Sequence, residues 1–151
     1  MKTCQLLAVA YATVLSGCAV YTDQGLYDVS ASDGWRREVS EATTIFYPPK
    51  ARNADGFIAF TTEKKGELLM VASFPGKSVR FEQKDLLIIP HDGGSSYHAS
   101  VDAARILVPS TSDFTIELPR VMIDDKLMPV IKARFIWSDR KYRSYRILQA
   151  P

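Results

Sequence analysis

A metal site is the first chemistry to consider, because two histidines and two aspartates lie close together in the sequence. His91 and His98 are the two imidazoles of the chain, and Asp92 and Asp102 are nearby. A zinc ion would need three or four ligands in fixed geometry. Histidines in a Gly- and Ser-rich stretch are more often solvated loop residues than ligands. We therefore expect neither a metal nor a cofactor.

The same stretch could supply a nucleophile. Ser95 and Ser96 precede His98, and nucleophilic catalysis needs a base within hydrogen-bond reach and an orienting acid. No Gly-x-Ser-x-Gly elbow surrounds these serines. Chance co-occurrence in a polar loop explains them better, and the chain offers no convincing set of nucleophile, base and metal ligands. We expect a protein that is not an enzyme.

Positive charge is concentrated near the C-terminus. We predict a last hairpin that joins residues 131–137 to residues 142–148, with six cations against Asp139 alone and a local formal charge of +5. The cations are Lys132, Arg134, Arg140, Lys141, Arg143 and Arg146. Tyr142 and Tyr145 lie among them, and Tyr and Arg are enriched at interface hot spots. We favour the interpretation that these residues form a solvated outer face, whose charges block pairing with the strand edge of another molecule. The alternative is a docking surface for anionic headgroups or an acidic partner.

The elements that must position these residues are strands. Val and Ile are frequent, Gly, Pro, Asp and Ser punctuate the chain, and long helical periodicity is absent. Residues 57–61 and 68–72 predict a hairpin whose turn uses Gly66. Further strands are predicted over residues 43–47, 79–82, 86–89, 103–108, 114–118 and 121–123. Residues 33–39 fit either a helical turn or a strand. We expect an all-β antiparallel sandwich or small barrel of about eight strands.

The N-terminal residues have the pattern expected of an export signal. Lys2 gives it a basic start, residues 6–15 are apolar, and small residues follow. The segment is too short to span a bilayer, which needs roughly 20 apolar residues. The run Leu15-Ser16-Gly17-Cys18 resembles the lipobox of bacterial lipoproteins. The resemblance implies cleavage before Cys18 and acylation of that cysteine, and two or three acyl chains attach a protein stably to a membrane.

The resemblance also implies a location and a domain plan. Ala19 and Val20, rather than Asp, follow the cysteine, which in enteric-type bacteria implies transfer to the outer membrane, with the domain facing the periplasm. We expect a signal peptide over residues 1–17, a lipidated N-terminus and tether over residues 18–33, and one β-sandwich domain over residues 34–151. Cys4 lies in the signal, so the mature chain forms no internal disulfide.

The net charge and the absence of catalytic motifs restrict the classes of function that we expect. The 19 basic residues of the chain less Lys2 leave 18 against 17 acidic residues, which argues against a nucleic-acid binder. We expect a non-catalytic, pilot-like interaction or assembly module that binds another envelope protein. The alternative is a lipid-anchored binding protein or inhibitor of a soluble ligand or hydrolase, acting through residues 92–98.

Overall fold

A computed structural model describes residues 19–30, 34–52, 55–109 and 113–147, with side chains described between residues 25 and 138. Residues Gly25–Arg140 form one compact unit, and residues 19–24 with 141–147 belong to a second. The predicted signal peptide over residues 1–17 and Cys18 lie outside the described residues. Within those residues, no helix is long and apolar enough to cross a membrane.

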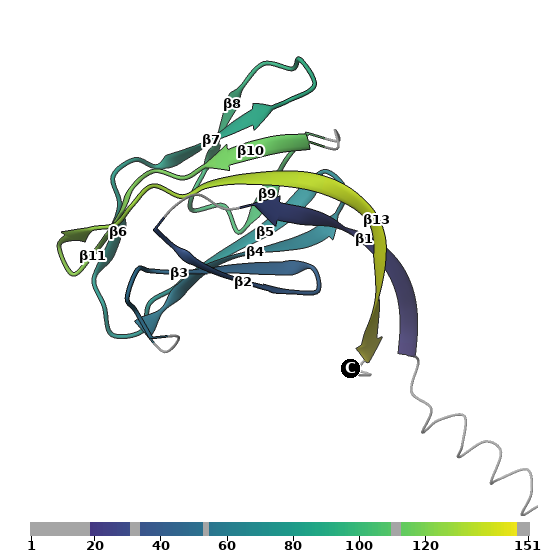
Figure 1. The fold of residues 1–151 in the computed structure, drawn as a ribbon, viewed down its shortest axis with the longest axis horizontal. Helices are drawn as coiled ribbons and strands as arrows, with labels where there is room; N and C mark the ends of the chain where they lie inside the picture. Colours follow the sequence, from purple (N-terminus) through teal and green to yellow (C-terminus); the bar gives the residue numbers. More distant parts are fainter. Residues whose placement is uncertain (1–18, 31–33, 53–54, 110–112, 148–151) are drawn as a thin grey trace, which may run out of the picture. The chain divides into compact units, whose positions relative to one another are not determined.

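The described residues are all β, with strands that form three antiparallel sheets (Figure 1). The strands are β1 (Ala19–Ser30), β2 (Arg36–Ser40), β3 (Thr43–Tyr47), β4 (Phe57–Lys64), β5 (Glu67–Ser73), β6 (Val79–Phe81), β7 (Asp85–Pro90), β8 (Tyr97–Ser100), β9 (Arg105–Leu107), β10 (Asp113–Glu117), β11 (Val121–Ile123), β12 (Lys126–Leu127) and β13 (Lys132–Ile147). Two sheets have five strands, in the orders β1-β13-β10-β7-β8 and β2-β3-β4-β5-β9, and the third has the order β12-β11-β6.

The sandwich-like architecture is confirmed, but the barrel alternative and the number of strands are wrong. None of the sheets closes on itself within the described residues, and these residues form 13 strands instead of about eight. Several of the additional strands have only two to four residues. A pattern of alternating residues needs a longer run than that to be recognised in a sequence.

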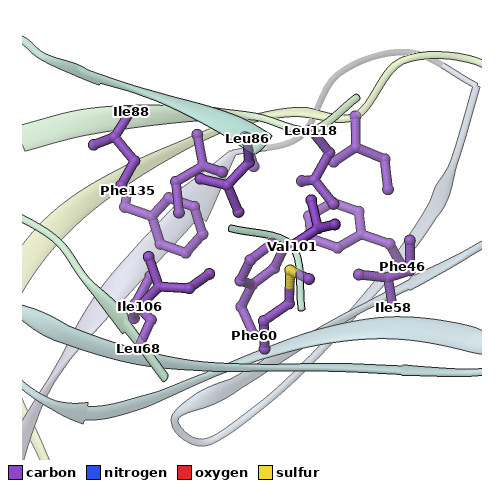
Figure 2. Close-up of a cluster of buried hydrophobic side chains, with 14 of the residues drawn as sticks. Phe46, Ile58, Phe60, Leu68, Leu86, Ile88, Val101, Ile106, Leu118 and Phe135 are labelled. Carbon is purple, nitrogen blue, oxygen red and sulfur yellow. The ribbon is translucent and has the colours of Figure 1, made fainter. Parts of the chain in front are cut away.

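The core fills the space between the two five-stranded sheets, where their side chains point toward one another (Figure 2). The rings of Phe60 on β4 and Phe135 on β13 are 5.6 Å apart, and Phe135 stacks on Phe114 of β10 at 5.2 Å. Phe114, Ile116 and Leu118 share the buried face, as their two-residue spacing predicts. Burying one such side chain contributes about 1.5–3 kcal/mol.

The hairpin predicted around Gly66 is confirmed, because β4 and β5 pair across a turn in which Gly66 has a φ of 89°. The hairpin predicted at the C-terminus is wrong. β13 runs without a break from Lys132 to Ile147 and pairs with β10 on one side and β1 on the other. The turn-like residues 138–141 contain no glycine, and β13 continues through them beyond its pairing with β10, which covers Lys132–Ile136.

The tether predicted over residues 18–33 is replaced by β1 over Ala19–Ser30. Its Tyr27 is only 4% exposed, lies 4.9 Å from the Trp137 ring between centroids, and belongs to the core. The Gly66 N–H donates a 3.0 Å hydrogen bond to the Tyr27 hydroxyl oxygen. The polar composition of this segment belongs to an alternating strand, in which Tyr27 faces the core and Asp28 is exposed. The ordered domain therefore begins before residue 34.

Candidate functional site

The predicted polar loop divides between two strands. His91 follows β7, and its Nε2 lies 2.7 Å from the Thr115 hydroxyl oxygen on β10. His98 lies on β8 opposite Leu87. Ser95 and Ser96 are exposed in the loop between these strands. The described residues contain no group of three or more His, Cys, Asp or Glu that could hold a metal ion.

The contact between His91 and Thr115 has the distance of a base and a hydroxyl nucleophile. The nearby acid is Asp113, whose carboxylate accepts hydrogen bonds from Arg134 Nε at 2.9 Å and Nη2 at 2.6 Å. These bonds and the Arg134 charge hold the pKa of Asp113 below its usual range. Asp113 is therefore engaged by a guanidinium, and we assign the His91–Thr115 contact to cross-strand pairing. Thr115 was not predicted, because nothing in the sequence relates it to His91.

In the described part of the predicted basic cluster, both cations form ion pairs with carboxylates. Lys132 Nζ lies 3.4 Å from a Glu117 carboxylate oxygen, and Arg134 binds Asp113. Both pairs join β13 to β10 on the face that points away from the core. The other predicted contact residues lie on β13, but their side chains are outside the described part: Arg140, Lys141, Tyr142, Arg143, Tyr145 and Arg146.

A surface that the sequence analysis missed lies on the other five-stranded sheet. We define the apolar outer face as the outward side chains of β3, β4 and β5: Ile45, Tyr47, Phe57, Ala59, Leu69 and Val71. Ile45, Ala59 and Val71 are direct neighbours across three strands. None of the six belongs to the core cluster. Val71 is 51% exposed, Ile45, Phe57 and Leu69 are partly exposed, and Tyr47 and Ala59 are buried. Antiparallel sheets with one solvated face usually carry polar residues there.

Charged residues border the apolar outer face on both sides. The Arg36 guanidinium of β2 lies 4.6 Å from the centre of the Tyr47 ring. On the opposite border, Arg105 of β9 binds Glu67 of β5 at 2.7 Å. An apolar centre with a charged rim is the anatomy of a protein–protein interface. The continuous apolar run at residues 68–72 was the available signal, because such runs indicate strands covered on both faces.

A separate cleft of about 330 Å³ lies beside the loop after β3 and the β11–β12 hairpin. Its apolar lining includes Pro48, Ile123 and Met128. Its polar lining is Lys50, Asp55, Lys77, Asp124 and Lys126. Lys77 Nζ lies 3.9 Å from Asp124, and the Asp55 carboxylate accepts a hydrogen bond from the Arg52 N–H. Apolar walls with lysines at the rim suit a small anion that has an apolar part.

Comparison with known proteins gives no relative: no family model, no curated protein and no solved structure matches this chain.

Proposed function

We propose that this chain is a lipoprotein held at the outer membrane by an acylated Cys18, with its sandwich facing the periplasm. It acts there as a non-catalytic interaction or assembly module, similar to a pilot protein, for another envelope protein. The Leu15-Ser16-Gly17-Cys18 run supports the anchor. The apolar outer face is the observation that carries the role.

An exposed apolar surface of this kind has an energetic reason to be covered. Val71 is half-exposed, and Ile45, Phe57 and Leu69 around it are only partly buried. Contact with a partner would remove this area from water, at about 25 cal/mol for each Å² of apolar surface. Because Arg105 is paired with Glu67, the charged border would favour a partner with a polar rim around an apolar centre. The partner in this proposal is therefore a folded protein with a flat apolar patch.

The lysine-lined cleft favours a second candidate, a lipid-anchored protein that binds a small soluble anion. Lys50 and Lys126 bring positive charge to a volume of about 330 Å³, within the usual range of small-molecule sites. This candidate replaces the loop at residues 92–98 with the cleft as the contact surface of the alternative function.

One experiment addresses the anchor and the role together. A photo-crosslinking amino acid is placed at Val71 of the full chain in cells, in the natural and the Cys18→Ser backgrounds, with exposed Lys84 as the matched control position. We expect Val71 to give one discrete cross-linked protein, Lys84 to give none, and Cys18→Ser to reduce the product. The intact mass of the purified protein checks that Cys18 is acylated.

The two parts of the proposal can fail separately. An unmodified Cys18 would refute the anchor, whatever the cross-links show. Equal cross-linking from Val71 and Lys84 would refute the role of the apolar outer face. The variant Val71→Asp gives an independent check, because it should abolish partner capture without lowering the melting temperature of a protein in which Val71 is half-exposed.

A further inference from the structure

The two ends of the described chain come together in one ribbon. β1 and β13 are neighbours in the sheet and run in opposite directions (Figure 1). Residues 19–24 of β1 and 141–147 of β13 belong to the same compact unit, which we call the ribbon. Within the larger unit, Gly25 of β1 lies against Trp137 of β13, where an added Cβ would be 2.2 Å from a ring carbon. The C-terminal end of β13 is therefore the neighbour of the first residues of β1.

The ribbon has the composition of a membrane interface. Its cations are Lys141, Arg143 and Arg146, and its one acidic residue is Asp23. Its aromatic residues are Tyr21, Tyr142 and Tyr145. Tyrosine is enriched at the headgroup level of membranes, and Lys and Arg are attracted to anionic lipids.

The strand pairing decides where this charge lies relative to the anchor. Cys18 immediately precedes Ala19, the first residue of β1. In an antiparallel pair, the start of β1 lies beside the end of β13. If Cys18 is acylated, as the proposed function requires, the ribbon begins one residue from the acyl chains. A residue spans at most about 3.6 Å of chain, so the start of the ribbon lies within a Debye length, about 8 Å, of the acylated residue.

We infer that the ribbon binds anionic phospholipid headgroups and forms a second membrane attachment beside the acylated cysteine. The other end of β13 differs in its electrostatics, because Lys132 and Arg134 are paired with Glu117 and Asp113. Headgroup binding therefore belongs to the ribbon and not to the whole predicted basic cluster. An acidic protein is a weaker assignment, because the ribbon is continuous with the residue that would carry the lipid.

The test uses vesicle binding without the acyl chains. The mature chain, residues 18–151 with Cys18→Ser, is sedimented with vesicles of phosphatidylcholine alone or mixed with phosphatidylglycerol. We expect binding to the mixed vesicles only, and loss of binding at high salt. The variant Lys141→Gln/Arg143→Gln/Arg146→Gln should bind about 100-fold more weakly, since each cation near an anionic surface contributes about a factor of five.

The matched control removes three exposed cations elsewhere, as Arg52→Gln/Lys84→Gln/Arg120→Gln, and should bind as the parent chain does. Equal losses in both variants, or no binding to phosphatidylglycerol, would overturn the inference. So would binding to polyglutamate in place of vesicles, which would assign the ribbon to an acidic protein. If circular dichroism shows that the triple ribbon variant is unfolded, Arg143→Gln alone should still lose about fivefold. The mass of Cys18 in the natural protein tests the anchor separately.

Discussion

At the scale of single residues, Arg134 shows how neighbours change the role of a charge. In the sequence it counts toward a basic cluster, whereas in the structure its guanidinium makes two hydrogen bonds to Asp113. These bonds raise the pKa of Arg134 and lower the pKa of Asp113. The pair links neighbouring strands β13 and β10. Its positive charge is therefore used within the fold, and a partner would meet little of it.

The Asp113 pair makes a prediction about pH. Because the pKa of Asp113 is lowered in the folded protein, the pair stabilises the fold above the ordinary carboxyl pKa, about 3.9. This stabilisation is lost as the pH falls through the lowered pKa. We expect Arg134→Gln to lower the melting temperature by a few degrees at most at pH 7, and by nothing at a pH below both pKa values.

Thermal unfolding of the natural protein and of Arg134→Gln, from pH 7 down to a pH below both pKa values, would measure the effect. Arg80→Gln is the matched control, because Arg80 lies 3.8 Å from the highly exposed Asp125 and makes a weaker pair. A difference between the natural protein and Arg134→Gln that stays constant down to the acid limit would contradict the assignment.

At the scale of elements, β13 organises its sheet by pairing on both edges. Its inward residues Ala133 and Phe135 belong to the core, while Lys132 and Arg134 are paired on the outer face. Its neighbour β1 accommodates Trp137 with a glycine, because Gly25 leaves room for the indole ring. β1 therefore has its small residue where the large indole ring of β13 packs.

This close approach predicts the effect of adding one methyl group. In Gly25→Ala the new Cβ would lie 2.2 Å from Trp137 Cζ2, so the ring has to move away from β1. We expect a loss of about 1–3 kcal/mol in the free energy of unfolding, as for other overpacked sites, and a shift in tryptophan fluorescence. Gly94→Ala is the control, since its Cβ would lie 3.3 Å from Pro90. Equal effects of the two substitutions would show that the indole ring does not constrain β1.

At the scale of the whole molecule, the fold joins segments that are far apart in sequence. The rings of Tyr27 and Phe135 are 6.1 Å apart, although they lie near opposite ends of the chain. The two five-stranded sheets also place non-consecutive strands side by side, such as β13 beside β10 and β10 beside β7. Such a topology must close long loops before its core contacts form.

The topology predicts slow folding for a domain of this size. All-β domains dominated by non-local pairing fold in about milliseconds to seconds, whereas local folds are much faster. Stopped-flow refolding of the mature chain with Cys18→Ser, followed by tryptophan fluorescence, measures the rate. A complete refolding phase in the microsecond range would contradict this prediction.

Much of the fold was predictable because it depends on local patterns. The alternation of Phe114, Ile116 and Leu118, the runs on either side of Gly66, and Pro48-Pro49 after a strand are visible in the sequence. They express the two-residue period of strands and the conformations open to glycine and proline, which depend only on neighbouring residues. The same patterns predicted an all-β sandwich and the hairpin of β4 and β5.

The tertiary structure decided which strands are neighbours and which charged side chains form ion pairs. Residues 138–141 resemble a turn, yet they continue β13, which has β1 as its other neighbour in the sheet. Arg134 belongs to a basic cluster in the sequence and to an ion pair in the fold. The polar segment before residue 34 becomes a core strand through Tyr27. Each outcome depends on contacts between distant residues, whose energies a local pattern does not contain.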